Sequence, residues 1–381
     1  MAIPAPHGGR LIDRTVRAPR LARSVQEAQE LPALPIGDEK VKDLENIAMG
    51  AFSPLEGFMT EDDLASVVHE RRLASGLPWT IPIVLDVDAA EAKGLAGDVA
   101  LTNAGEVIAT IRVEQTYPFD KNGMAERVFG TVDANHPGVA KVFAMKDRLV
   151  GGKIELLAWA EDPFADARRP PAEIRAAIEQ KNLKTVVGFQ TRNVPHIGHE
   201  YLQKIALTVH DGLFINPVIG KKKAGDFQDE VILATYRVLL ENYYRRERVI
   251  FGTLETEMRY AGPVEAIFHA IVRKNFGCSH IIIGRDHAGV GSYYGPYAAR
   301  EIFSEFPDLG ISPLPFDELF YCKRCYGIAS ERVCPHGPDD QVRFSGTKVR
   351  EIFKGGQRPP AEFMRPEVSD TVLSFERPFI E

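Results

Sequence analysis

The sequence of 381 residues has few cysteines, no excess of positive charge and no long apolar run. A helix that crosses a bilayer needs about 20 consecutive apolar residues, and no stretch of this chain approaches that length. The N-terminus also lacks the apolar run of a secretory signal. These absences exclude a membrane-spanning protein, and we expect a cytosolic protein with no membrane partner.

The second deficit is in basic residues. The chain has 46 lysines and arginines against 53 acidic residues, a formal net charge of −7. Proteins that grip the phosphate backbone of nucleic acids usually carry a positive excess or a clear basic stripe. We therefore expect no nucleic-acid partner, and any anionic ligand must be met by local positive charge.

Three of the four cysteines are clustered. Cys322, Cys325 and Cys334 are followed by His336 in the spacing C-x2-C-x8-C-x-H. Four such ligands in so short a segment suit a closed tetrahedral zinc site, which has no open position for water and is therefore structural. A chance gathering of unligated residues and a zinc module for nucleic acid are the alternatives, but the flanking sequence lacks a basic, aromatic surface.

The length and a hydrophobic content of 44% favour two or three domains. Short β-branched segments between glycine, aspartate and asparagine turns predict a β-rich N-terminal domain with strands at 80–87, 106–117 and 153–159. Two arginines and a Pro-Pro pair then mark a connector near residue 165. The predicted domains are 1–165, 166–320 and 321–381.

The middle of the chain alternates apolar strand candidates with amphipathic helices. The strand candidates lie at 184–190, 212–220, 248–254 and 280–284. Strict alternation predicts an α/β fold with a parallel sheet that is covered on both faces. In such sheets, ligands bind beyond the carboxyl ends of the strands.

The segment QTRNVPHIGHEYL (190–202) follows the first of these strands. A helix that begins near its proline would offer free backbone N–H groups and a positive dipole end to an anion. His196 and His199 are three residues apart, so both rings can reach one phosphate, and Arg192 adds a fork of N–H donors. Alternatively, the histidines are only caps or core residues; a metal site is less favoured because no third ligand is near.

A second polar segment follows the strand at 280–284. Arg285, Asp286 and His287 come directly after its isoleucines, and Gly289 and Gly291 allow backbone amides to approach a ligand. The alternative is an ordinary glycine turn with an Arg–Asp ion pair. Two charged strand ends on one edge of one sheet favour a binding site.

Four separated segments together resemble ATP sulfurylases, and the resemblance runs from about residue 44 to the C-terminus. They are DLENIAMGAFSPLEGFM, FQTRN with H-x-x-HE, the segment from MRYAGPVEAIF to GRDHAGVGSYYGPY, and SGTKVREIFKGGQRPPAEFMRPEV. The resemblance implies a Rossmann-like nucleotidyltransferase domain, a PUA-like N-terminal domain and a small helical C-terminal domain. It implies a reversible reaction of ATP and Mg²⁺ with sulfate to give adenosine 5'-phosphosulfate and pyrophosphate.

The resemblance also implies roles for residues. Gln190 and Arg192 would bind sulfate, and a backbone amide near Ala288 would assist; Asn193 would hold the nucleotide phosphates. The implied catalytic residues are Arg192, His196, His199 and Arg285. The implied residues for sulfate and ATP are Gln190, Thr191, Arg192, Asn193, Gly284, Asp286, His287 and Ala288.

Some features stay open at this stage. The family usually has proline directly after the asparagine, whereas Val194 follows Asn193 here. Lys221–Lys223 is either a loop over the phosphates or a solvated charge run, and Ser345 and Thr347 are either phosphate ligands or helix caps. The chain has no G-x-x-x-x-G-K-[ST] loop, so no fused adenylyl-sulfate kinase activity is expected. The family suggests a homo-oligomer, with a dimer favoured.

Overall fold

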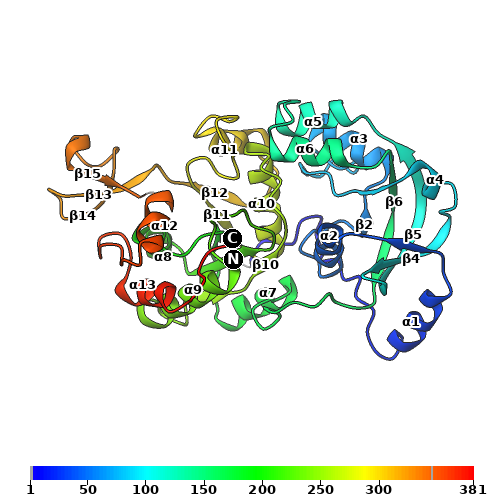
Figure 1. Ribbon diagram of the computed structural model, residues 1–381, viewed down its shortest axis with the longest axis horizontal. Helices are drawn as coiled ribbons and strands as arrows, with labels where there is room; N and C mark the ends of the chain where they lie inside the picture. The colour runs from blue at the N-terminus through cyan, green and yellow to red at the C-terminus, as the bar shows by residue number, and fades with distance from the viewer. Residues whose placement is uncertain (1–2, 345) are drawn as a thin grey trace.

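The computed structural model describes residues 3–344 and 346–381. Three parts follow one another along the long axis of the molecule (Figure 1). They are the N-terminal part with the first sheet (33–156), the central part with the second sheet (186–315) and a small C-terminal sheet (319–343). Among the described residues, no helix is long and apolar enough to span a bilayer.

The N-terminal part is built on a six-stranded sheet in the order β1-β4-β5-β6-β2, with β3 paired to β6. Its strands are β1 (Ala33–Pro35), β2 (Gly57–Phe58), β3 (Leu85–Val87), β4 (Gly97–Asn103), β5 (Glu106–Pro118) and β6 (Arg148–Leu156). Its helices are α1 (Leu21–Gln29), α2 (Asp38–Ala48), α3 (Glu61–Glu70), α4 (Ala89–Ala92), α5 (Lys121–Phe129) and α6 (Pro137–Ala144). The sequence analysis located this sheet but did not foresee the helices.

The strand predicted at 80–87 is wrong for its first half, because only Leu85–Val87 is a strand. Pro82 has no N–H to donate to a neighbouring strand. Its neighbours Ile81 and Ile83 are nevertheless buried, at 1% and 0% exposed. Burial of an irregular segment produced the same apolar pattern as a strand.

The central part confirms the predicted parallel sheet. The strand order is β10-β8-β7-β11-β12, with β9 paired to β8, and every pair in it is parallel. Its strands are β7 (Val186–Thr191), β8 (Gly212–Ile219), β9 (Val249–Phe251), β10 (Leu254–Glu255), β11 (His280–Ile283) and β12 (Ser312–Pro315). Its helices are α7 (Pro171–Gln180), α8 (Ile197–Val209), α9 (Asp229–Tyr243), α10 (Pro263–Asn275) and α11 (Ala298–Glu301).

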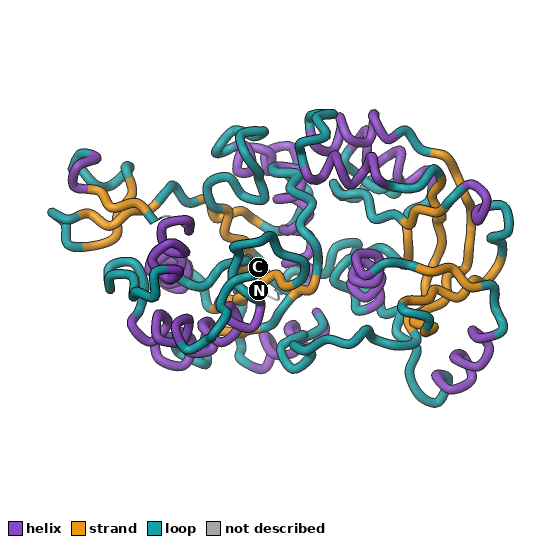
Figure 2. The backbone as a smooth tube through the Cα atoms, viewed as in Figure 1, coloured by secondary structure: helices purple, strands orange, loops and turns teal. Residues whose placement is uncertain are grey.

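Two hydrophobic cores cover the two faces of this sheet. The larger core combines side chains of α10 and one sheet face with the interior of the N-terminal part, where Phe52 and Trp79 meet the ring of Phe268 at 5.0 and 5.5 Å. The other core joins the opposite face to α8, α9 and the C-terminal helices. Helix α10 therefore lies between the two sheets, as Figure 2 also shows.

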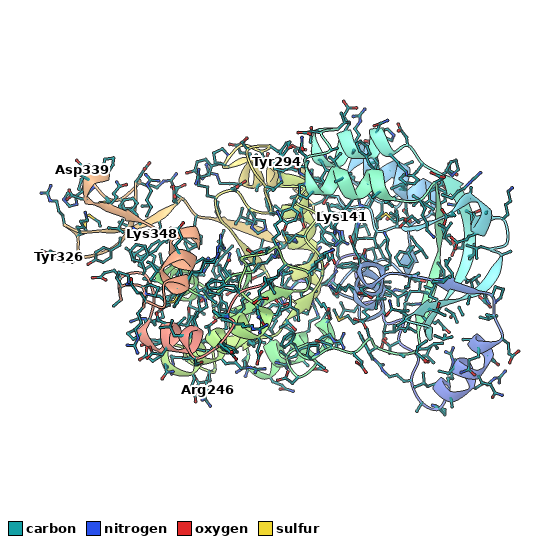
Figure 3. The ribbon with its side chains drawn as sticks, in the orientation of Figure 1. Lys141, Arg246, Tyr294, Tyr326, Asp339 and Lys348 are labelled. Atoms are coloured by element: carbon teal, nitrogen blue, oxygen red, sulfur yellow. The ribbon has the colours of Figure 1, made fainter. Side chains whose placement is uncertain are left out.

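The C-terminal part begins with a three-stranded sheet at one end of the molecule. It consists of β13 (Leu319–Cys322), β14 (Gly327–Ser330) and β15 (Gln341–Arg343), and two helices follow, α12 (Gly346–Lys354) and α13 (Pro366–Leu373). The side chains of Tyr326 and Asp339 mark its outer tip in Figure 3. The chain then returns across the central part.

Candidate functional site

The two polar segments predicted from the sequence emerge at the same edge of the central sheet. Strands β7 and β11 are neighbours in parallel pairing, with Gly188 opposite Ile281. The residues that follow β7 and those that follow β11 therefore start side by side. Gly284, the first residue after β11, has open space where a side chain would begin.

The two histidines of the first segment stack on each other. Their ring centroids are 3.7 Å apart, with planes at 19°, and the Phe344 ring stacks on His196 at 5.2 Å. Burial lowers the pKa of His199 to about 4, and burial with the neighbouring ring holds the pKa of His196 well below its usual value. Both imidazoles are therefore neutral at pH 7.

The start of α8 differs from the expected open anion site. The ring Nδ1 of His196 accepts a hydrogen bond from the His199 backbone N–H at 3.3 Å, so His196 caps the helix. The Ile197 N–H donates to the Phe363 carbonyl at 2.8 Å. Both amides therefore already have internal partners, the first from the His196 ring and the second from the C-terminal part, which folds over the start of α8.

Arg192 has two hydrogen-bond partners from later segments. Its Nη1 donates to the Tyr260 hydroxyl at 2.9 Å and its Nη2 donates to the Lys221 carbonyl at 3.3 Å. The Lys223 ammonium lies 4.6 Å from the centroid of the Tyr260 ring. Tyr260 therefore links the guanidinium after β7 to the lysine run, a contact that the sequence did not reveal.

The lysine run is not uniformly solvated. The Lys222 side chain is only 2% exposed, and its ammonium lies 3.0 Å from Asp229 at the start of α9. Burial lowers the Lys222 pKa, although Asp229 opposes this effect. Lys222 therefore fixes the loop, while the Lys221 carbonyl contacts Arg192 and the Lys223 ammonium lies over the Tyr260 ring.

Gln190 is held from behind by α10. Its Nε2 lies 3.0 Å from Nδ1 of His269, and the same Nδ1 lies 3.1 Å from Nε2 of His287. Glu265 is 3.4 Å from the other ring nitrogen of His269. This network joins the segment after β7 to the segment after β11. The sequence analysis assigned no role to Glu265 or His269, although their four-residue spacing within the otherwise apolar run 263–272 was a readable signal.

The loop after β11 has a fixed backbone. Asp286 and Ala288 adopt left-handed φ values of 53° and 58°, and the Ala288 carbonyl accepts from the Gly262 N–H at 3.0 Å. A Cβ at Gly289 would lie 2.0 Å from Oδ1 of Asp286, so a larger residue there would require the Asp286 side chain to move. Burial raises the pKa of Asp286.

Arg285 does not form the Arg–Asp ion pair considered as the alternative. Its side chain is 52% exposed, and its nearest acidic partner is Glu318, at 3.8 Å. A surface pair at that distance contributes little to stability, on the order of 0–1 kcal/mol. The Arg285 guanidinium is therefore available to an anion at the sheet edge.

The remaining residues of the first segment shape its turn. The Thr191 hydroxyl accepts from the Asn193 N–H at 3.2 Å and donates to the Asn193 carbonyl at 3.3 Å. Val194 is 2% exposed and belongs to the second core, so an apolar residue at this position is accommodated by packing. Ser345 and the Thr347 side chain lie outside the described residues.

The cysteine cluster could hold a metal ion. The ligand atoms of Cys322, Cys325, Cys334 and His336 lie within 4.8 Å of one another. Tetrahedral bonds to zinc would separate two sulfurs by about 3.8 Å and a sulfur from a nitrogen by about 3.5 Å. Here Sγ of Cys325 and Cys334 are 3.8 Å apart, and His336 Nδ1 lies 3.3–3.6 Å from the three sulfurs. The donor set and its spacing both fit.

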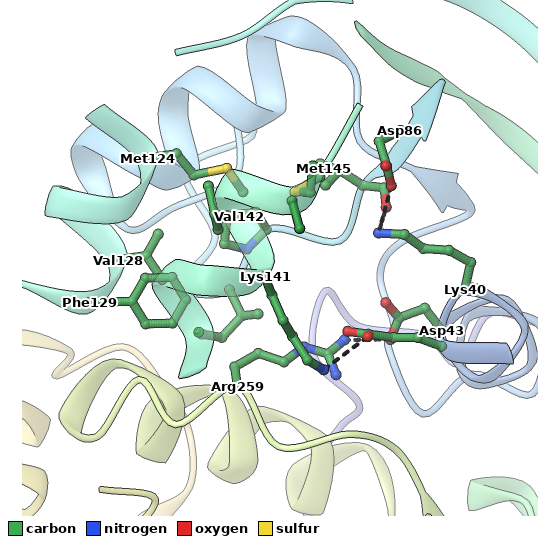
Figure 4. A pocket seen from close by; sticks show the side chains of 16 residues that line it. Lys40, Asp43, Asp86, Met124, Val128, Phe129, Lys141, Val142, Met145 and Arg259 are labelled. Atoms are coloured by element: carbon green, nitrogen blue, oxygen red, sulfur yellow. Dashed lines mark hydrogen bonds and ion pairs between the residues drawn. The ribbon is translucent and has the colours of Figure 1, made fainter. Parts of the chain in front are cut away.

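A separate cavity of about 280 Å³ is lined by the N-terminal part and by Arg259 from the loop before α10 (Figure 4). Apolar side chains such as Met124 and Phe129 line one side, and Asp43 and Arg259 form an ion pair of 2.5 Å on the other. None of the functional-site residues predicted from the sequence lines this cavity. It borders the Arg259–Ala261 loop that precedes α10.

Comparisons with known proteins can now be set beside this geometry. A family model described as ATP-sulfurylase matches residues 165–375, and one described as a PUA-like domain matches residues 4–158. Proteins named sulfate adenylyltransferase from Hyperthermus butylicus and Pyrococcus abyssi are each 54% identical over 378 residues, which is 99% of this chain and 97% and 99% of those proteins.

One solved structure also resembles the whole chain. It is described as a hexameric APS kinase from Thiobacillus denitrificans and has a TM-score of 0.76 at 21% identity, covering 99% of this chain and 69% of that chain. At this identity, the likeness bears on the fold alone. It agrees with a parallel-sheet α/β part joined to a sheet-containing N-terminal part.

Proposed function

The chain belongs to the ATP-sulfurylase family, and from that membership we propose that it transfers the adenylyl group of ATP to sulfate, giving adenosine 5'-phosphosulfate and pyrophosphate. The observation that carries the proposal is the 54% identity to proteins named sulfate adenylyltransferase, which extends over 99% of this chain. The two cationic strand ends on one sheet edge support it. The reaction is reversible, and ATP enters with Mg²⁺, which accompanies its phosphates.

The proposed reaction is a direct in-line displacement. A sulfate oxygen attacks the α-phosphorus while the bond from that phosphorus to the bridging oxygen breaks, and pyrophosphate leaves with the electron pair. Sulfate is a very weak base and carries no proton at neutral pH, so no general base is required. Catalysis then consists of positioning and of stabilising negative charge.

We assign the sulfate to Gln190 and Arg192, with a backbone amide near Ala288 on the neighbouring loop. Arg192 suits this role because its planar fork matches two oxygens of a tetrahedral anion. Tyr260 and Lys221 hold the guanidinium by hydrogen bonds of 2.9 and 3.3 Å, which supports a fixed orientation. Thr191 shapes the turn on which Arg192 stands.

We assign the phosphates of ATP to the stacked histidines, Asn193 and Arg285. Neutral imidazoles donate one N–H each without repelling the Mg²⁺ that accompanies the nucleotide. Arg285 counters the charge that builds on the α-phosphoryl group, because its guanidinium has only a distant partner. Gly284, Asp286 and His287 complete the proposed set by fixing the loop around the nucleotide.

For the cysteine cluster we propose zinc in a closed structural site. Three thiolates and one imidazole fill a tetrahedral shell, so the ion would brace the sheet of β13–β15 rather than take part in the reaction. We also propose a cytosolic homo-oligomer, with a dimer favoured, and domain divisions at 165 and 320. Light scattering of the purified protein measures the oligomeric state.

The proposed function is tested by pyrophosphate release. The purified protein is incubated with ATP and Mg²⁺, with and without sulfate, and pyrophosphate is measured by a coupled assay. We expect release that depends on sulfate and formation of adenosine 5'-phosphosulfate in equal amount. Release that is independent of sulfate, or transfer of the adenylyl group only to another acceptor, would contradict the proposal.

A further inference from the structure

Helix α10 carries a row of polar side chains inside a core. Glu265, His269 and Arg273 follow one another at four-residue intervals and are 1%, 1% and 0% exposed. Buried polar groups are costly unless they are paired, so such a row needs a reason. Its middle member contacts Gln190, which lies at the carboxyl end of β7.

Glu265 determines which ring nitrogen of His269 carries the proton. Its two carboxylate oxygens accept hydrogen bonds from the N–H groups of Arg259 and Ala261 at 2.8 and 3.0 Å. A carboxylate can only accept, so the His269 nitrogen that lies 3.4 Å away must donate to it. The remaining nitrogen, Nδ1, then presents a lone pair as long as the ring is neutral.

Several groups keep the ring neutral. Burial lowers the pKa of His269, and the positive charges of Arg273 and Arg259 lower it further, while Glu265 opposes them. His287, which faces the same Nδ1, also has a pKa well below its usual value because it is buried. The His269 Nδ1 atom therefore offers its one lone pair to the Gln190 amide nitrogen at 3.0 Å, and Nε2 of His287 lies 3.1 Å from the same atom.

The hydrogen bond to His269 Nδ1 orients the Gln190 amide, because the carbonyl oxygen of that amide makes no hydrogen bond of its own within the described part of the chain. Among the described residues, its Oε1 atom is buried and has no hydrogen-bond partner, whereas Nε2 meets His269 Nδ1 at 3.0 Å. Nε2 also lies 3.3 Å from the ring Nε2 of His269, but that nitrogen carries the proton directed to Glu265 and cannot accept. The sulfur of Met258, at 3.9 Å, is a weak acceptor. One N–H of Gln190 is thus committed to His269, and the second is left for a stronger acceptor.

From these contacts we propose that the buried Glu265–His269 pair positions the Gln190 amide so that it presents N–H, and not C=O, to the oxyanion substrate. The inference rests on the proposed function, since it takes Gln190 as a sulfate ligand. If the His269 lone pair were removed, the amide could turn over and its carbonyl oxygen would repel sulfate. Glu265 and His269 are positioning residues, because they act through Gln190.

The test compares three substitutions of His269 by the steady-state KM for sulfate and for ATP. His269→Leu removes the acceptor and is expected to raise KM for sulfate about tenfold to a hundredfold, the effect of losing one hydrogen bond to an ion. His269→Asn keeps an oxygen near the position of Nδ1 and should restore most of the affinity. His269→Gln places its amide near the position of Nε2, toward Glu265, and should not restore the affinity for sulfate. KM for ATP should change little in all three.

A background variant separates positioning from a general structural effect. In a Gln190→Ala protein, His269→Leu should add no further increase in KM for sulfate, because the group through which it acts is gone. A folded His269→Leu protein with the parent KM for sulfate would overturn the proposal. Equal behaviour of the Asn and Gln variants would overturn it as well.

A measurement on the parent protein covers the case in which the variants do not fold. Nitrogen NMR of the histidine-labelled chain reports which ring nitrogens carry protons, and the proposal requires an unprotonated Nδ1 in His269. A protonated Nδ1 overturns it. A parent protein without sulfate-dependent pyrophosphate release would refute the proposed function, whereas an active parent with unaffected variants would refute only the positioning role.

Discussion

At the scale of single residues, the site uses side chains whose charge state is determined by their surroundings. The stacked histidines are held neutral by burial, whereas Arg192 and Arg285 supply the positive charge of their guanidinium groups. The site can therefore combine permanent positive charge with neutral N–H donors. The neutrality of the histidines follows from packing, because the His196 ring stacks on both His199 and Phe344.

The lowered histidine pKa values predict a stability change in acid. An unfolded histidine titrates near pH 6.5, whereas folded His199 and His7 titrate near 4. Between these values the unfolded chain binds more protons, so the free energy of unfolding should fall as pH drops from 6.5 to 4, by about 3 kcal/mol for each group. Urea unfolding at several pH values measures this slope. His7→Asn should flatten it, and an unchanged slope in that variant would contradict the assignment.

Substitution of Arg192 should abolish turnover and leave the fold intact. Arg192→Ala removes the proposed sulfate fork, and we expect kcat/KM for sulfate to fall at least about a hundredfold, the scale seen when a positioned donor to a reacting anion is lost. Tyr260→Phe keeps the guanidinium and loses only its 2.9 Å hydrogen bond, so it serves as a milder control. Circular dichroism and metal content should match the parent. Near-normal turnover in Arg192→Ala would be incompatible with the proposed role.

At the scale of elements, the position of each strand and helix decides which neighbours complete the site. Pairing of β7 with β11 brings the two polar segments together. The C-terminal part then closes over the start of α8, where the Glu200 carboxylate receives two hydrogen bonds from Arg365 at 2.8 and 2.9 Å. The small sheet of β13–β15 stands apart from these contacts at one end of the molecule (Figure 1).

Removal of metal should affect that small sheet first. We expect about one zinc per chain by elemental analysis, and its loss in Cys322→Ser, because Cys322 is fully buried at the centre of the ligand set. Limited proteolysis should then cut between residues 323 and 341, while the parallel sheet stays protected. Tyr326→Ser lies in the same loop, is 84% exposed and should leave metal content unchanged. A Cys322→Ser protein with full zinc content would refute the assignment.

At the scale of the whole molecule, the N-terminal part contacts the loop before α10, which leads to the back of the site. Asp43 on α2 pairs with Arg259 at 2.5 Å, and the backbone N–H of Arg259 binds Glu265, which in turn contacts His269. The N-terminal part is thus connected to the back of Gln190 by direct contacts. The shared core around α10 makes the two parts one packed unit.

A matched pair of substitutions tests that connection. Asp43→Asn should destabilise the protein by about 3 kcal/mol, because it leaves the buried Arg259 guanidinium without its counter-ion. Asp98→Asn breaks an exposed pair with Arg112 at 2.8 Å and should cost less than about 1 kcal/mol. Thermal unfolding and KM for sulfate are measured in both. Equal effects would show that the contact with Arg259 is dispensable.

The sequence by itself determined the parallel sheet, the two segments at its edge and the cysteine cluster. Strand and helix periodicity, motif spacing and metal-ligand spacing are local properties, so they can be read along the chain. The positions of β7, β8, β9 and β11 were predicted well, whereas β12 to β15 and the helices of the N-terminal part were not predicted. There, short helices lack the long periodicity that makes an amphipathic helix recognisable.

Only the tertiary structure decided which groups support the site. Glu265 and His269 lie more than seventy residues from Gln190 in sequence. Phe344, which stacks on His196, and Phe363, whose carbonyl accepts from the Ile197 N–H, lie farther still from the segment that they contact. The neutrality of the histidines, the capping of α8 and the burial of Lys222 all depend on such distant contacts. Burial and hydrogen-bond partners arise from packing between segments, and no local pattern encodes them.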